Sequence, residues 1–287
     1  MRLQHFFDAR TSTLTWAVHD ADSRRAIVID PVADFDPKSG RLWFESCEAV
    51  ARHLEAHGLE LAHVLETHAH ADHLSGAPWL KHRFGAPVAI GAHITDVQAL
   101  FRDVFNLGPD FPVDGSQFDR LLADGDVLEV GSLRVEALHT PGHTPACLTY
   151  RIGDALFVGD TLFAPDHGTA RCDFPGGSAE TLYDSIQRLY AFPDATRVML
   201  CHDYQPGGRA LVAETTIGAQ KRGNVQLDAR TSKPAYAAFR RRRDAELDMP
   251  VLILPSVQVN IRAGELPPPE SNGVRYLKLP INRLGAG

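Results

Sequence analysis

The segment 67–73, with the sequence THAHADH, constrains this chain more than any other. It places three histidines and one aspartate within residues 68–73, and each would need a buried polar partner or open water if it bound no ion. Residues 61–66 are mainly apolar and predict a strand, and residues 74–80 can begin a helix. In open α/β sheets, ligands bind where strands end. The histidine loop therefore predicts a metal site at a strand end.

Composition limits the class of protein. With 287 residues, 44% of them hydrophobic, the chain can bury the core of one large domain, or of a domain with a small appendage. A formal charge of -7 argues against a nucleic-acid partner. The arginine run 240–243 is followed by Asp244 and Glu246, which indicates a solvated helix face with partners one turn away.

The sequence also bears on where the protein is located and on its partners. The sequence has no run of about twenty apolar residues, so we expect no membrane span. The first seven residues are too polar for a signal peptide, and the four cysteines show no CxxC spacing, which is typical of a reducing compartment. We therefore expect a cytoplasmic protein, and the sequence leaves a homodimer open.

Strand and helix patterns alternate along the chain. The predicted strands are 13–19, 25–30, 61–66, 87–90, 197–200 and 250–254, with hairpins joining 126–130 to 133–138 and 147–152 to 155–158. Helices are predicted over 42–58, up to about 84, up to 105, and over 178–190, 209–222 and 234–246. Residues 106–125 predict a long loop, in which Phe111 and Phe118 are interpreted as anchors, or alternatively as walls of a substrate cleft. This order favours two packed β-sheets with helices outside.

Three further segments repeat the pattern of a polar donor placed directly after an apolar strand. They contain His143 in TPGHT, Asp160 in VGD and His202 in CHD. One such segment would be weak evidence, but four that can turn into one cleft predict a metal centre. A complete shell suits two metals with a bridging hydroxide for hydrolysis. It also suits one iron held by two histidines and one carboxylate.

The order and spacing of these donors resemble the metallo-β-lactamase superfamily, whose signature HxHxDH is followed by further His, Asp and His ligands. The resemblance runs from about residue 10 to 205 and implies an α/β fold, a four-layer αββα sandwich with a short C-terminal extension. We expect a catalytic domain at 1–208, with C-terminal helices and a final strand at 209–287 packed on it. The two-metal form would use His68, His70 and His143, then Asp72, His73 and His202, with Asp160 as the bridge.

Blocks around the donors resemble one branch of this superfamily, the bacterial persulfide (sulfur) dioxygenases. They comprise residues 67–73, 141–145, 159–162, 171–174 and 202–204, with further similarity at 112–118 and 254–260. The resemblance implies an enzyme with one Fe(2+) per chain on His68, His143 and Asp160, which would be the catalytic residues. His70, Asp72, His73 and His202 would orient ligands and waters through hydrogen bonds, or hold a second metal.

The reaction implied by this resemblance converts glutathione persulfide, O2 and water into glutathione and sulfite. The alternative is a binuclear thioester hydrolase of the glyoxalase II type with two Zn(2+) ions. A nuclease, a lactonase and a metal-binding module without turnover are further alternatives, because the fold hosts many reactions.

Glutathione carries two carboxylates, so cationic and phenolic side chains should line the cleft. We expect Arg171 and Tyr204 to contact the substrate, because both stand beside donor segments and match family positions. Lys221 and Arg222 are weaker candidates. The alternatives are a structural pair of Arg171 with Asp173 and a buried hydroxyl for Tyr204.

Two cysteines, Cys172 and Cys201, flank the same segments. Reaction of their thiols with persulfide is one interpretation. We favour small buried packing instead, since free cysteines are among the most buried residue types.

Overall fold

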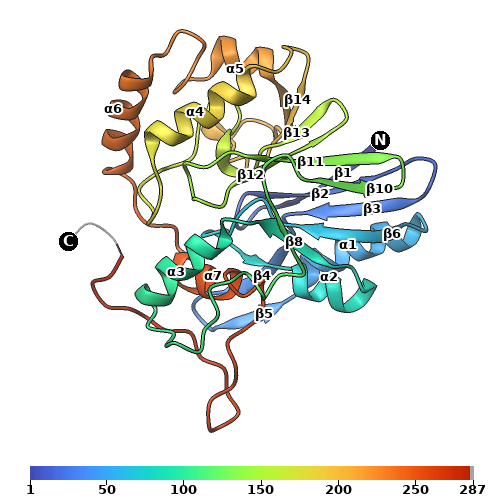
Figure 1. Ribbon diagram of the computed structural model, residues 1–287, viewed down its shortest axis with the longest axis vertical. Coiled ribbons are helices and arrows are strands. Elements are labelled where there is room, and N and C mark those ends of the chain that lie inside the picture. The colour runs from blue at the N-terminus through green and yellow to red at the C-terminus, as the bar shows by residue number, and fades with distance from the viewer. Residues whose placement is uncertain (285–287) are drawn as a thin grey trace.

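Two six-stranded β-sheets face each other in the computed structural model, which describes residues 1–284 (Figure 1). The first sheet has the order β1 (Arg2–Asp8), β2 (Thr13–His19), β3 (Arg25–Ile29), β6 (Glu60–Leu65), β8 (Val88–Gly91) and β9 (Arg120–Leu122). The second has the order β10 (Val127–Val130), β11 (Leu133–His139), β12 (Leu148–Ile152), β13 (Ala155–Phe157), β14 (Arg197–Met199) and β15 (Glu214–Thr216). Between their inner faces lies a buried core that includes Trp16, Leu65, Tyr150 and Phe157.

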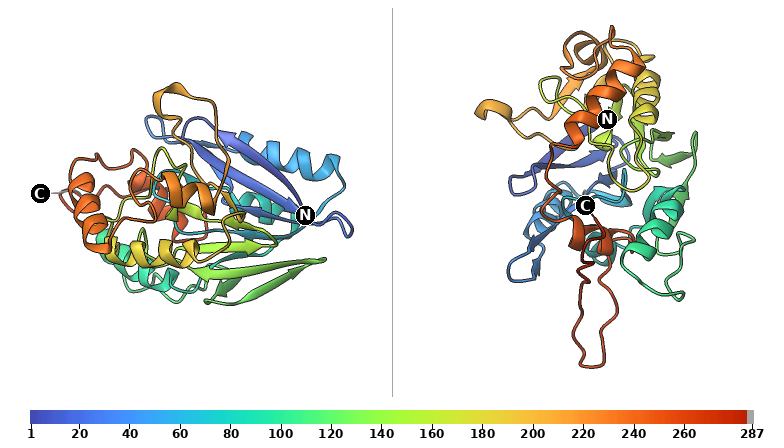
Figure 2. Two further views of the ribbon diagram at one scale, coloured as in Figure 1. Left: turned by 90° about the horizontal axis from the view of Figure 1, so that it is seen from above. Right: turned by 90° about the vertical axis from the view of Figure 1, so that its left-hand side faces the viewer.

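Helices cover both outer faces, which confirms the predicted four-layer αββα sandwich (Figures 1 and 2). On the first sheet lie α1 (Glu45–Ala56), α2 (Ala77–Phe84) and α3 (Ile94–Val104). On the second lie α4 (Ala179–Tyr190), α5 (Ile217–Gly223) and α6 (Lys233–Asp244). The local sequence explains α4: the Ser178 side chain accepts the amide of Thr181 at its start, and Leu182, Ile186 and Leu189 then recur on one buried face.

Parallel pairing brings the donor segments together at one edge. Strands β3, β6 and β8 run parallel, so Asp30 and the histidine loop leave the first sheet on the same side. Strands β13 and β14 are also parallel, and the short 3-10 helix η1 (Gly159–Thr161) and His202 follow them. Backbone bonds join the two sheets here, from Leu14 N to Cys201 O at 2.7 Å and from Leu148 N to Thr67 O at 2.8 Å. The site therefore lies at the seam between the sheets.

The small third sheet, β5 (Arg41–Trp43), β4 (Val32–Asp36) and β7 (Leu74–Ser75), and the first strand β1 were not predicted. The helix expected at 42–58 is shorter because residues 42 and 43 pair with β4. The alternation of apolar and polar residues in these short edge segments is too brief to stand out from loop sequence.

The C-terminal region differs most from expectation. The predicted final strand at 250–254 is wrong: these residues form a turn that enters helix α7 (Ile253–Asn260), whose Ile253 and Val257 are buried one helical turn apart. The helix predicted at 209–222 is divided into a loop, β15 and α5, preceded by the 3-10 turn η2 (Pro206–Gly208). After α7 the chain extends as a long loop away from the sheets (Figure 2). The last three residues of the predicted region 209–287 lie outside the described residues.

The loop at 106–125 contains β9 but is otherwise irregular. Phe111 and Phe118 are 4% and 6% exposed and belong to the core beneath α3, and Arg262 packs over the Phe111 ring at 4.6 Å. They anchor the loop and do not line the cavity described below, so the cleft-wall alternative is wrong. Among residues 1–284, no helix has the length and hydropathy needed to cross a membrane.

Candidate metal centre

The centre of the site is a buried group of two histidines and one carboxylate. Donor atoms of His68, His143 and Asp160 all lie within 4.8 Å of one another. Nε2 of His68 is 3.8 Å, and Nε2 of His143 is 3.5 Å, from Oδ2 of Asp160. The three residues come from the loops after β6 and β11 and from η1 after β13, so each of the two sheets contributes. The structure thus brings together the three residues predicted as iron ligands.

Other protein groups fix the orientation of these rings. Nδ1 of His143 lies 2.8 Å from the main-chain oxygen of Arg171, to which it donates, and Nδ1 of His68 lies 3.0 Å from the Thr67 hydroxyl. Each contact leaves the Nε2 atom directed at Asp160. This is the arrangement by which metal-binding histidines are usually oriented.

A second group surrounds Asp72. Its Oδ2 lies 3.5 Å from Nδ1 of His73 and 3.4 Å from Nε2 of His202, which is also 3.2 Å from Oδ1 of Asp160. The Thr13 hydroxyl lies 3.3 Å from Nδ1 of His202, which directs the other nitrogen inward. Asp160 therefore stands between the two groups, as a bridging carboxylate would.

His70 occupies a separate position with two acidic neighbours. Its Nε2 lies 3.0 Å from Asp30 and 3.4 Å from Glu66, and Asp30 also accepts the amide and hydroxyl of Thr67. Sequence reasoning did not select Asp30 or Glu66. Their position in the sequence could have identified them as site residues, since each is an acidic residue at the end of an apolar strand.

Several inward atoms are buried and lack hydrogen-bond partners among the residues that the structure describes. They are Nε2 of His68, Nδ1 of His70, Nε2 of His73, Nε2 of His202 and Oδ1 of Asp160. Buried polar atoms are rarely left unpaired in folded proteins, and their gathering at one point needs an explanation. Imidazole and carboxylate donors that converge in this way fit a bound transition-metal ion.

The charges of the site favour a cation. Burial by itself would lower the pKa of His202, but the neighbouring carboxylates of Asp72 and Asp160 raise it to about 9. Burial likewise opposes the ionisation of Asp30, yet the charge of His70 and its hydrogen bond bring the pKa of that carboxyl to about 2. The raised pKa of His202 thus shows that Asp72 and Asp160 favour a positive charge beside them, whereas Asp30 is balanced by His70.

Two features at a distance in sequence hold the histidine loop in shape. Nδ2 of the buried Asn260 donates to the main-chain oxygens of His70 and His73 at 2.8 Å each, and its Oδ1 accepts the amide of Ser75 at 2.8 Å. Gly159 has φ +51°, and a Cβ there would stand 2.6 Å from the Thr67 hydroxyl oxygen. The role of Asn260 was not predicted, because nothing in the tail sequence links it to the loop.

A cavity of about 1440 Å³ opens from this centre to the surface. Its lining includes His143 and Asp160 of the centre, then Phe163, Arg171 and Tyr204, and several residues of the β4–β5 hairpin. The Tyr204 ring stacks on His167 with centroids 4.6 Å apart, and it is 44% exposed. The cavity is large enough for a peptide-sized substrate to reach the centre.

Most of the chain resembles known proteins. The family model described as Metallo-beta-lactamase superfamily matches residues 10–202. The chain belongs to that superfamily. It is 52% identical to a probable metallo-hydrolase of Burkholderia pseudomallei, in an alignment that covers 99% of this chain and all of that protein. It is 43% identical to glyoxylase B2 of Dictyostelium discoideum, over 99% of this chain and 98% of that protein. It is 50% identical to a beta-lactamase hydrolase-like protein of Xylella fastidiosa, of whose length it spans 65%.

The resemblance to the persulfide dioxygenase branch is confirmed among the superfamily relatives. The human mitochondrial persulfide dioxygenase ETHE1 is 29% identical over 70% of this chain and 68% of its own. The crystal structure of ETHE1 from Myxococcus xanthus aligns with a TM-score of 0.74 and 30% identity, over 92% of this chain and all of that one. The fold prediction is thereby confirmed.

Not all of the residues predicted to contact the substrate line the cavity. Arg171 lines it, but its guanidinium is held by Asp173 at 2.7 Å and by the main-chain oxygen of Asp248 at 2.7 Å. The predicted alternative of a pair with Asp173 is therefore present. Lys221 and Arg222 lie outside the cavity lining, because both are directed at Asp194, at 2.7 and 3.7 Å. We remove these two from the predicted substrate contacts.

Arg240 is 2% exposed and pairs with Asp244 at 2.7 Å, so the expectation of a solvated face is wrong at this position. Its head group also donates to Gln226 at 2.7 Å, and the residue lines the cavity. Cys172 and Cys201 are 8% and 2% exposed, as the favoured interpretation of buried packing expects.

Proposed function

We propose that the protein is a persulfide dioxygenase with one ferrous iron, which converts glutathione persulfide, O2 and water into glutathione and sulfite. The observation that carries the proposal is the buried group of His68, His143 and Asp160, whose donors lie within 4.8 Å of one another. Two imidazoles and one carboxylate are the donor set of non-haem Fe(II) oxygenases, and they leave coordination positions open. The likeness to the human and Myxococcus proteins supports the same reaction.

Ferrous iron, when bound, would supply the redox chemistry with oxygen and the persulfide sulfur. The protein's own residues would position it. The main-chain oxygen of Arg171 and the Thr67 hydroxyl fix the rings of His143 and His68, and Asp160 balances the charge of the cation. His202, which contacts both Asp160 and Asp72, would then orient Asp160, and His70 and His73 would orient nearby waters through hydrogen bonds.

The cavity would receive the thiol part of the substrate. Phe163 and Phe174 give it apolar walls near the centre, which would exclude bulk water from the reacting sulfur. We propose that Arg171 and Tyr204 contact glutathione, Arg171 through the charge that it places on the wall and Tyr204 through its exposed ring. The predicted location in the cytoplasm, and a second copy as partner, are not needed for this arrangement.

A specific observation favours a second candidate, a binuclear thioester hydrolase. Asp72 stands between His73 and His202, and the inward Nε2 atoms of both histidines lack hydrogen-bond partners within residues 1–284. A second ion there, bridged by Asp160 to the first, would activate water for hydrolysis. The name of the Dictyostelium relative, glyoxylase B2, agrees with such a reaction.

Two assays on one preparation separate these candidates. Protein purified without oxygen is analysed for metal, loaded with one Fe(2+) per chain, and mixed with glutathione persulfide while oxygen uptake and sulfite are followed. We expect equal amounts of oxygen consumed and sulfite formed. Absence of uptake with iron bound refutes the dioxygenase, and release of thiol from lactoylglutathione by a two-zinc form supports the hydrolase.

The variant Asp160→Asn links the activity to the metal centre. It removes the negative charge that faces both His68 and His143 while it keeps the size of the side chain. We expect lower metal content and lower turnover together. Full activity with full metal content would exclude Asp160 as an iron ligand, and circular dichroism provides the folding control.

A further inference from the structure

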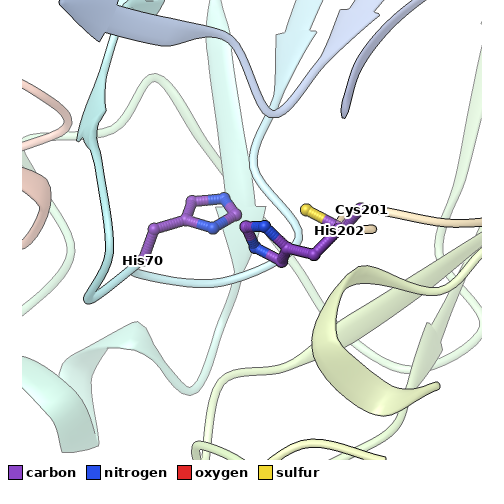
Figure 3. A group of neighbouring side chains, drawn as sticks. All are labelled: His70, Cys201 and His202. Carbon is purple, nitrogen blue, oxygen red and sulfur yellow. The ribbon is translucent and has the colours of Figure 1, made fainter. Parts of the chain in front are cut away.

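We propose that Cys201 binds metal, and that His70, Cys201 and His202 form a thiolate-containing site for a zinc-like ion. One donor atom from each residue lies within 4.8 Å of those of the other two. Figure 3 shows the imidazole rings of His70 and His202 facing each other, with the sulfur of Cys201 beside the His202 ring. The exposed fractions of the three residues are 0%, 2% and 0%, so bulk water does not reach them.

The hydrogen bonds around these side chains leave room for a ligand. Nδ1 of His70 and Nε2 of His202 have no hydrogen-bond partner in the part of the chain that the structure describes. The Cys201 sulfur has one weak contact, with Oδ2 of Asp30 at 3.5 Å. Both histidines also have a donor atom within 4.8 Å of the weakly bonded thiol, and buried nitrogens without partners are unusual unless something else binds them.

The chemistry of the donors indicates which ion would bind. Cysteine sulfur and imidazole nitrogen are the ligands that zinc prefers, and thiolates select soft or borderline metals. The group of His68, His143 and Asp160 instead contains a carboxylate and no sulfur, which suits iron. The two groups share no residue, so one ion in each would not compete for donors.

The observed spacing is close to that of a closed site. Ligands bound to tetrahedral zinc at its usual bond lengths stand about 3.3 to 3.7 Å apart. The donor atoms here are at most 4.8 Å apart, so each pair would have to approach by about 1.5 Å at most. Small side-chain rotations can produce a movement of this size. Binding would release the proton of the Cys201 thiol, as metal binding by cysteine does.

This site differs from the second site of the two-metal hydrolase. There the second ion uses Asp72, His73 and His202, whereas here it uses sulfur and leaves Asp72 free to contact His73. The inference does not rest on the persulfide reaction, since it concerns only which atoms hold an ion. A failure of oxygen uptake and a failure of sulfur ligation are therefore separate results.

Cobalt provides a direct probe of the sulfur. The metal-free full chain is titrated to saturation with Co(2+) in the absence of oxygen, and the near-ultraviolet spectrum is recorded. We expect a thiolate-to-cobalt charge-transfer band in the wild type, its loss in Cys201→Ser, and its retention in Cys147→Ser. Cys147 is a matched control because it is equally buried and bonds to Thr144 outside the group.

A second measurement needs no variant. X-ray absorption at the zinc edge of the wild type, loaded with zinc after iron has filled its own site, should show a sulfur neighbour at about 2.3 Å. A shell of nitrogen and oxygen alone overturns the proposal, as does a cobalt spectrum without the band at full occupancy. A band that persists in a folded Cys201→Ser protein also overturns it.

Discussion

The strongest test of how the tail controls the metal loop is the substitution Asn260→Ala. The Asn260 side chain makes three hydrogen bonds of 2.8 Å, two to the oxygens of His70 and His73 and one from the amide of Ser75. At a net value of about 1 kcal/mol for each bond, their loss should lower the free energy of unfolding by about 3 kcal/mol. Asn260 is 4% exposed, so water cannot easily replace the amide.

The measurement separates stability from metal binding. Urea unfolding of chelated protein gives the first quantity, and competition with a chromophoric chelator gives the affinity for metal. We expect the affinity to fall by about 10- to 100-fold, because residues that orient ligands usually have effects of this size. Asn272→Ala is the matched control, since Asn272 is exposed and its side chain bonds to the Tyr276 hydroxyl and the Val274 amide, with no contact to the histidine loop among the described residues. An unfolding free energy within about 0.5 kcal/mol of wild type, with unchanged affinity, refutes the reasoning.

Three further changes test other parts of the structure. Gly159→Ala should lower metal content by at least about tenfold, because residue 159 has a positive φ and its new Cβ would clash with the Thr67 hydroxyl. A metal content equal to that of the wild type would contradict this. Hydrogen bonds, above all from Ser23, hold the pKa of Asp20 below its usual range in the folded protein. Asp20 therefore stabilises the fold above its unfolded-state pKa, and this stabilisation is lost as pH falls through its folded-state pKa. Asp20→Asn should make the thermal midpoint fall less steeply with decreasing pH, and an unchanged slope would exclude Asp20 as its source. Arg171→Met should raise KM about tenfold and leave kcat nearly constant, because the main-chain oxygen of residue 171 that orients His143 remains. Steady-state kinetics measure both constants, and an equal fall in kcat would assign Arg171 to the chemical step.

The sequence predicted those parts of the fold and site that depend on local pattern. A donor after an apolar strand can be recognised from the few residues around it, as at His68, His143 and Asp160, and the structure gathers these three. The hairpins and helix α4 were predicted for the same reason, since their turn residues and apolar spacing are contiguous.

What depends on distant partners could not be predicted. Apolar residues at 250–254 suggest a strand, and only their packing against the first sheet shows why Ile253 and Val257 form a helix face. Lys221 is held away from the cavity by an ion pair with Asp194, which precedes it by 27 residues in the sequence. Asn260 is a polar residue in an apolar tail until the fold brings it to the histidine loop.

The position of the centre at the seam has a consequence for how the protein is held together. The first sheet supplies the histidines of residues 68–73, and the second supplies His143, Asp160 and His202. The group of His68, His143 and Asp160 therefore draws its donors from both halves of the sandwich. A cation bound by that group would link the two halves in addition to their shared core and backbone bonds, so removal of the ion should weaken the contact between the sheets.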